Sequence, residues 1–252
     1  MIKVSCLCPT FARAYLLEES VFSFLQQDYE HCELIICNDM PKQQFVFDHP
    51  RVKIINQASR CTSLGEKRNL TASYATGDVL LTWGDDDIHL KHRISRMVHA
   101  YERSPYKHII REGAYITLYG EKVVHSKNSP AGACLVNTSS FHKAGGIPLM
   151  NCGEDCAFLV RMRSVFPVAY IPEASGPPAF IYRWSGSNRP HISGFGEDKE
   201  GKKSGWDRML ERAEQLLQAG KEPSGTYNLS PVWRRDYYKV ITGEEDFTHI
   251  YT

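Results

Sequence analysis

Residues 77–87 read GDVLLTWGDDD, an apolar run from Val79 to Trp83 that is followed by three consecutive aspartates. A short apolar run bounded by glycines is typical of a buried strand. Carboxylates gathered at the end of a strand suit a divalent cation, because Mg²⁺ and Mn²⁺ prefer oxygen ligands and often bind one or two carboxylates plus substrate phosphates. The alternative for Asp85, Asp86 and Asp87 is an acidic turn that caps a following helix.

Strand and helix patterns alternate around this stretch: strands at 2–8, 34–37 and 52–55, helices at about 13–27 and 64–75. The nearly continuous apolar strands favour a Rossmann-like α/β fold, a mostly parallel sheet flanked by helices. In open sheets of this kind, ligands bind outside the carboxyl ends of the strands. Polar clusters that follow strand ends should therefore line one crevice: Pro9-Thr10, Asn38-Asp39 and the aspartate triplet.

The rest of the chain has a less regular pattern. It predicts a helix over 91–103, a hairpin over 116–124 that turns at Tyr119-Gly120, a helix from Glu154 through about Ser164, a strand at 168–171 and a helix at 205–219. The polar segment 174–196, with its glycines and prolines, is predicted to be a mobile loop. The C-terminal tail, 221–252, is rich in aromatic residues and shows no periodic pattern.

Composition is that of a soluble globular protein: 252 residues, 42% hydrophobic, 23% charged and a formal net charge of +1. No run approaches the ~20 apolar residues that span a bilayer, and the N-terminus has no signal-peptide pattern, so we expect a soluble, cytoplasmic protein. The eight cysteines are expected to be reduced and mostly buried. Cys152 and Cys156 lack a second pair at zinc spacing.

Together these motifs resemble the family 2 glycosyltransferases of the GT-A fold, which are inverting, metal-dependent enzymes that use nucleotide-diphosphate sugars. The resemblance covers roughly residues 1–190 and keeps the order of the family's motifs. It rests on five segments: Val4–Arg13, Leu34–Asp39, Gly65–Asn69, Gly77–Asp87 and Gly153–Asp155. Tyr182–Trp184, with the later His191, is also similar to an acceptor-side loop of the family that sometimes contacts metal or phosphate. It implies a nucleotide-sugar-binding half over 1–112, a smaller acceptor and catalytic half over 113–196, and a C-terminal helix with its tail over 197–252.

The resemblance also implies roles for individual residues. The turn containing Pro9, Thr10 and Arg13 would contact the nucleotide, and Asp39 would bind uracil or another base. Lys67 and Arg68 are candidate phosphate contacts. Asp85 would reach the ribose, Asp86 or Asp87 would bind the metal, and Asp155 would be the general base supported by Glu154. His191 is a candidate third metal ligand. Several of these residues have a structural alternative. Asp39 could form a turn, and Lys67 and Arg68 could be solvated charges on a helix. Glu154 and Asp155 could be an acidic pair favoured by the helix dipole, and His191 could be an ordinary loop histidine.

The chemistry of sugar transfer requires residues of these types. A bound Mn²⁺ or Mg²⁺ would neutralise the charge that develops on the leaving diphosphate. A carboxylate at a helix start, partly desolvated and beside another acid, could have the raised pKa that suits a base acting on the acceptor hydroxyl. Asp155, with Glu154 beside it, fits this description.

Two departures from the family pattern narrow the activity. Gly84 stands where the family usually has an aspartate, so the sequence leaves open which two of the three aspartates act as the DxD pair. The Gln-x-x-Arg-Trp motif and the membrane helices of processive synthases are missing, which favours transfer of a single sugar. The resemblance to the family, and no residue of the chain by itself, implies UDP as the favoured nucleotide. Two other classes of protein are alternatives. A nucleotidyltransferase of the same layout would carry glycines in the turn Pro9–Arg13, and this turn has none. A non-catalytic sugar-nucleotide-binding module would not need a base such as Asp155.

The acceptor is not identified by the sequence. Residues 91–111 carry six arginines and lysines against one glutamate, Glu102. A basic surface there could attract an anionic acceptor such as a lipid-linked saccharide, a phosphorylated glycan or nucleic acid. An ordinary solvated helix face is the alternative, and a modified DNA base as acceptor has no supporting nucleic-acid motif.

Overall fold

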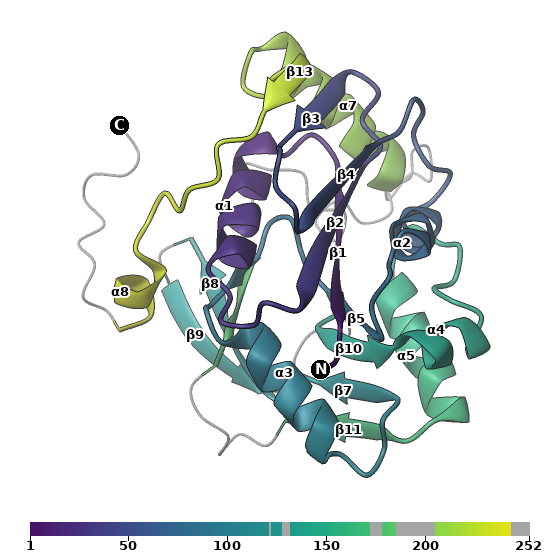
Figure 1. Ribbon diagram of the computed structural model, residues 1–252. Helices are drawn as coiled ribbons and strands as arrows, with labels where there is room; N and C mark the ends of the chain where they lie inside the picture. The colour runs from purple at the N-terminus through teal and green to yellow at the C-terminus, as the bar shows by residue number, and fades with distance from the viewer. Residues whose placement is uncertain (121, 128–131, 172–177, 185–204, 243–252) are drawn as a thin grey trace.

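The computed structural model of the chain describes residues 1–120, 122–127, 132–171, 178–184 and 205–242. Its centre is a seven-stranded sheet with the order β11-β7-β10-β5-β1-β2-β4 (Figure 1). The strands are β1 Val4–Thr10, β2 Cys32–Asn38, β4 Val52–Asn56, β5 Val79–Thr82, β7 Ile109–Arg111, β10 Cys134–Asn137 and β11 Val168–Tyr170. β10 is antiparallel to both of its neighbours, and the other six strands run in one direction.

Helices cover both faces of this sheet, as the apolar strand patterns predict. One face packs on α1 (Ala14–Leu25) and α3 (Arg93–Arg103), whose buried residues include Leu17, Phe24 and Met97. The other face packs on α2 (Leu64–Ser73), α4 (Thr138–Lys143) and α5 (Glu154–Val165). Side chains alternate between the two cores along β5, with Leu81 in the first and Leu80 in the second.

Two smaller sheets extend the structure. The first has the order β6-β12-β8-β9, formed by Ile88–His89, Phe180–Trp184, Ala114–Tyr119 and Lys122–Lys127. Its β8–β9 pair is the predicted hairpin. β12 corrects the prediction of a loop over 174–196, because Phe180 and Ile181 are buried and pair with β6. The second pairs β3 (Gln43–Val46) with β13 (Gly225–Asn228).

Local chemistry explains the boundaries of α2. The Ser63 side chain accepts a hydrogen bond from the Glu66 amide. The Glu66 carboxylate accepts one from the amide of Thr62, the residue before the N-cap, so the arrangement is a variant of the capping box. The C-terminal cap of the helix is Tyr74, so Gly77 lies beyond the helix. A Cβ at Gly77 would lie 2.7 Å from Ser5 Oγ and 2.8 Å from Lys3 O. Glycine is needed there for close packing against β1.

The described part of the C-terminal tail, residues 221–242, shows no pattern in the sequence and contacts α1. After α7 (Gly205–Gln218), the chain runs along α1 to α8 (Tyr237–Thr242) (Figure 1). Glu18 and Glu19 on α1 are each only 3% exposed. Glu18 accepts hydrogen bonds from the Tyr227 hydroxyl at 2.9 Å and from Arg234 at 2.8 Å, and Glu19 accepts one from the Tyr237 hydroxyl at 2.8 Å. Buried carboxylates on α1 therefore anchor the tail.

Candidate active site

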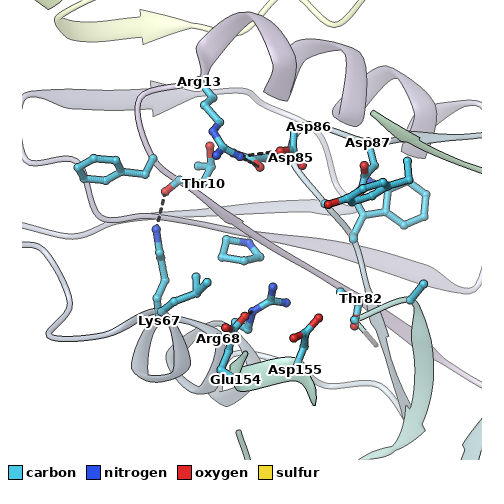
Figure 2. Close-up of a pocket in the computed structure, with 18 of the residues that line it drawn as sticks. Thr10, Arg13, Lys67, Arg68, Thr82, Asp85, Asp86, Asp87, Glu154 and Asp155 are labelled. Carbon is cyan, nitrogen blue, oxygen red and sulfur yellow. Dashed lines mark hydrogen bonds and ion pairs between the residues drawn. The ribbon is translucent and has the colours of Figure 1, made fainter. Parts of the chain in front are cut away.

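A pocket lies at the carboxyl ends of β1 and β5, where the sheet topology places ligands (Figure 2). Its walls come from the β1–α1 turn, α2, the end of β5, the start of α5, β12 and α7. Ten of the residues singled out in the sequence line it: Pro9, Thr10, Arg13, Lys67, Arg68, Asp85, Asp86, Asp87, Glu154 and Asp155. Asp39 lies beneath the wall, fully buried, and His191 lies outside the described residues.

Arg13 binds two members of the aspartate triplet. Its Nη1 lies 3.0 Å from Asp85 Oδ1 and 2.9 Å from Asp86 Oδ2 (Figure 2). The side chains of Arg13, Asp85 and Asp86 are 10%, 6% and 17% exposed, so these ion pairs are largely shielded from water. The first turn of α1 therefore contributes a cation directly to the acidic end of β5.

Asp87 is held differently from the other two aspartates. Its Oδ1 accepts a hydrogen bond from the backbone amide of Arg183 at 3.2 Å. The carboxylate folds back toward Gly84, where a Cβ would lie 2.4 Å from Asp87 Oδ2. Any side chain at position 84 would displace Asp87, which gives a physical reason for glycine at the position where the family usually has an aspartate.

The triplet carries negative charge in a poorly solvated place. Burial raises the pKa of Asp87 well above its ordinary value, and the charge of Asp86 raises it further. Burial also raises the pKa of Asp85, although Arg13 opposes this shift. Asp85 Oδ2 is buried, and a hydrogen bond from the Thr10 side chain only partly offsets the effect of burial on the pKa of Asp85. A further cation would lower the free energy of this cluster.

The donor set fits a divalent cation that is shared with a ligand. Over the described ranges, no group of three histidine, cysteine, aspartate or glutamate side chains forms a ready-made metal cage. Mg²⁺, however, is usually bound by only one or two carboxylates together with substrate phosphates. Asp85 and Asp86, which already converge on one cationic nitrogen, supply such a pair.

Lys67, which lines the pocket, pairs with the buried Asp39 beneath the pocket wall. Lys67 Nζ lies 2.6 Å from Asp39 Oδ1 and donates to the Thr10 carbonyl at 3.2 Å. The second Asp39 oxygen accepts the Cys61 amide at 3.1 Å. Both side chains are almost completely buried, at 2% and 0% exposure. Lys67 thus supports the β1 turn and Asp39, and Arg68 is the neighbouring cation that faces the pocket (Figure 2).

Glu154 and Asp155 lie across the pocket from the triplet, at the N-terminus of α5 (Figure 2). Glu154 is 5% exposed and forms an ion pair with Arg68, Nε to Oε1, at 3.0 Å. Asp155 is half-buried and its Oδ1 accepts the Cys156 amide at 2.7 Å. Arg68 compensates the charge of Glu154, so Asp155 is the carboxylate of this pair that is available to a ligand.

Contacts between α2 and the chain before α5 fix the relative position of Arg68 and Glu154. The Leu64 amide donates to Asn151 Oδ1 at 3.0 Å, and the Gly65 amide donates to the Met150 carbonyl at 3.1 Å. A Cβ at Gly65 would lie 1.9 Å from the Pro148 carbonyl oxygen, so only glycine permits this approach. Asn69 exchanges two hydrogen bonds of 2.8 Å with the backbone of Ile147.

The structure adds aromatic residues to the site that motif analysis missed. Trp206, at the start of α7, lines the pocket beside Phe11. Between them lies the Arg60 guanidinium, 3.8 Å from the Trp206 ring centroid and 4.5 Å from that of Phe11. Trp206 stands three residues before Met209 in the predicted amphipathic helix, so helical spacing could have identified it as part of the buried face.

Arg183 on β12 connects the triplet to the C-terminal tail. Its Nε donates to the Asp86 carbonyl and its Nη1 to the Glu19 carboxylate. Nη1 also lies 2.9 Å from the Tyr237 hydroxyl, which donates in turn to Glu19. The backbone of the triplet is thereby tied to α1 and α8, although these residues are distant in the sequence.

The predicted basic surface over 91–111 is wrong in part. Arg93 and Arg111 are 1% and 7% exposed. Arg93 lines the active-site pocket, and its guanidinium lies 4.2 Å from the Phe180 ring centroid. Arg96 forms an ion pair of 3.8 Å with the buried Glu112. Because these arginines make internal contacts, the exposed basic residues of this segment are reduced to Lys91, Arg103 and Lys107.

Comparisons with known proteins agree with this geometry. The family model "Glycosyl transferase family 2" matches residues 5–152. The chain is 27% identical over 122 residues to "Putative glycosyltransferase EpsE" of Bacillus subtilis (strain 168), an alignment that covers 45% of this chain and 44% of EpsE. It is 22% identical over 168 residues to the UDP-Glc:alpha-D-GlcNAc-diphosphoundecaprenol beta-1,3-glucosyltransferase WfgD of Escherichia coli, covering 64% of this chain and 61% of WfgD.

Solved structures share the fold. Residues 1–349 of S. aureus TarS superpose with a TM-score of 0.60 at 14% identity, covering 72% of this chain and 60% of that one. The complex of the same protein with UDP-GlcNAc gives a TM-score of 0.61 at 14% identity, with coverages of 74% and 60%. The chain therefore spans less than two thirds of the length of each of these proteins. Across the described ranges, no helix is long and apolar enough to cross a membrane.

The family model covers more than half of the sequence, from β1 through the triplet to the residue before Gly153. The matched segment forms the central strands and most of the pocket wall. The chain belongs to glycosyl transferase family 2.

Proposed function

We propose that this protein is an inverting glycosyltransferase that moves one sugar from a UDP-sugar to a hydroxyl group of an acceptor. One observation carries the proposal: a single pocket has the aspartate triplet on one side and Asp155 on the other (Figure 2). Sugar transfer needs charge stabilisation at the leaving diphosphate and a base at the acceptor hydroxyl. WfgD is named for a UDP-Glc donor, and TarS was solved with UDP-GlcNAc, which supports UDP as the nucleotide.

On the donor side, Asp85 and Asp86 are the residues that would hold Mn²⁺ or Mg²⁺, because they converge on one point. This gives Asp85 a metal-binding role instead of the ribose contact that the resemblance implies. When bound, the cation neutralises the charge that develops on the departing diphosphate. Asp87, also a candidate ligand by sequence, orients β12 and the triplet through the Arg183 amide. Arg68 presents a guanidinium to the same pocket, where its planar fork suits phosphate oxygens.

On the acceptor side, Asp155 takes the proton from the acceptor hydroxyl. The acceptor oxygen then forms a bond to the anomeric carbon from the face opposite the diphosphate. The bond from the anomeric carbon to the diphosphate oxygen breaks, and UDP leaves with that electron pair. The Cys156 amide fixes the orientation of the Asp155 carboxylate, and the Arg68–Glu154 ion pair fixes the start of α5. Glu154 is a positioning residue in this scheme.

The first experiment measures UDP release from UDP-GlcNAc and UDP-glucose with Mn²⁺ or EDTA, because slow donor hydrolysis needs no known acceptor. We expect metal-dependent UDP release with one donor. Asp155→Asn should lower this rate by about 10²- to 10⁴-fold while UDP binding is retained. Asp48→Asn is the control, because Asp48 is exposed and does not line the pocket.

Three outcomes would contradict, in turn, the assignment of the base, the classification as an enzyme and the proposed function. Full turnover by Asp155→Asn would refute the assignment of the base. Tight UDP-sugar binding without UDP release in the wild type, with or without added saccharide acceptors, would favour a sugar-nucleotide-binding module. Absence of nucleotide binding under all conditions would refute the proposed function itself.

A further inference from the structure

Arg13 is held over the triplet by an unusual backbone turn. Ala12 has φ +50°, the sole positive φ at a non-glycine position in the described part of the chain. L-residues rarely adopt this conformation, so it persists only where surrounding structure enforces it. Ala12 is fully buried and packs in a cluster with Phe11, Met40 and Met209. The core beneath the pocket therefore positions the Arg13 side chain.

The contacts of Arg13 resemble those of a bridging metal ion. One nitrogen, Nη1, contacts oxygens of two adjacent carboxylates, at 3.0 Å on Asp85 and 2.9 Å on Asp86. Divalent cations bind through the same carboxylate lone pairs. A metal ion cannot bridge Asp85 Oδ1 and Asp86 Oδ2 while the guanidinium lies between them. The two cations are therefore mutually exclusive on these atoms.

We propose that Arg13 is an internal competitor of the divalent cation, so that the metal binds weakly alone and strongly together with the donor diphosphate. A diphosphate offers the guanidinium an alternative anionic partner, because arginine pairs well with phosphate oxygens. Moving Arg13 from the carboxylates to the diphosphate vacates the oxygens for the metal. The coupling rests on the proposed function, since it needs a diphosphate donor, whereas the competition between Arg13 and the metal does not.

The test measures Mn²⁺ binding by the full chain from the electron paramagnetic resonance signal of free Mn²⁺, with no nucleotide present. We expect Arg13→Gln to bind Mn²⁺ about tenfold more tightly than the wild type, a typical size for a coupling between two sites. Adding UDP should tighten Mn²⁺ binding strongly in the wild type and much less in Arg13→Gln. Within each protein, Mn²⁺ should tighten UDP binding by the same factor by which UDP tightens Mn²⁺ binding.

Arg68→Gln is the matched control. It removes one positive charge from the same pocket, but its partner is Glu154 and not the triplet. We expect its nucleotide-free Mn²⁺ affinity to stay close to that of the wild type. An equal gain in Arg68→Gln would show a general charge effect and overturn the competition.

Two further results would overturn the proposal. The first is an unchanged or weakened Mn²⁺ affinity in nucleotide-free Arg13→Gln that retains the circular dichroism spectrum of the wild type. The second needs no variant: a wild-type Mn²⁺ affinity that is the same with and without bound UDP. If UDP does not bind the wild type at all, the proposed function fails, and the nucleotide-free comparison still decides the role of Arg13.

Discussion

Replacing Lys67 with methionine should destabilise the protein far more than the loss of an ordinary ion pair. Lys67 Nζ lies 2.6 Å from Asp39 Oδ1, and the side chains are 2% and 0% exposed. At an effective dielectric constant of about 20, that separation corresponds to an attraction of about 6 kcal/mol. Desolvation of the two ions costs several kcal/mol each, so the pair as a whole contributes little net stability.

The single substitution removes the attraction and leaves the desolvation cost of Asp39 in place. Among the residues that the structure describes, only the Cys61 amide would then donate a hydrogen bond to the Asp39 carboxylate. We therefore expect Lys67→Met to lower the free energy of unfolding by about 3–5 kcal/mol. The Lys67→Met/Asp39→Asn double variant should recover much of this loss, because asparagine is neutral and can still accept the Cys61 amide.

Urea unfolding of the wild type, both single variants and the double variant at constant pH measures this coupling directly. Lys42→Met is the control, because Lys42 pairs with Glu214 at a similar distance, 2.9 Å, but the side chains are 59% and 39% exposed. Its expected cost is at most about 1 kcal/mol. A comparable loss in the two lysine variants, or a double variant no more stable than Lys67→Met, would refute the reasoning.

Two further predictions concern the tail and a buried acid. Tyr237→Phe removes the hydroxyl that lies 2.8 Å from Glu19 and 2.9 Å from Arg183. We expect the free energy of unfolding, measured in urea, to fall by about 1–3 kcal/mol, and the rate of UDP release to fall. If both values were unchanged, α8 would not support the triplet. Burial raises the pKa of the Glu112 carboxyl group above 4.5. Between pH 4.5 and the raised pKa, the folded protein keeps the carboxyl proton and the unfolded protein has lost it. The contribution of Glu112 to the free energy of unfolding therefore falls as the pH rises through this range. The unfolding free energy of Glu112→Gln minus that of the wild type should therefore increase over this range, and a pH-independent difference would contradict the assignment.

Local pattern was sufficient for most of the central sheet and for the place of the pocket. The apolar runs of β1, β2 and β5 are visible without any tertiary information, because strands buried on both faces need apolar side chains at successive positions. The strands β7 and β10 were not predicted, because they are only three and four residues long. β12 lies in a stretch rich in glycine and proline, and it is a strand because β6 and β8 supply its hydrogen bonds.

Polar clusters that follow parallel strands emerge at one edge of the sheet, and this rule correctly predicted that Thr10 and Asp85 share a pocket. It was wrong for Asn38 and Asp39, which are completely buried and do not line that pocket. The pairing of the charges in and around that pocket does not follow from the sequence pattern. Arg13 contacts Asp85 across 72 positions of sequence, and Lys67 contacts Asp39 across 28. Such pairings depend on distances and burial that no local pattern encodes, because electrostatic attraction and desolvation are set by the packed surroundings of each charge. The same holds for the C-terminal tail, whose aromatic residues acquire defined partners only where the buried carboxylates of α1 meet them.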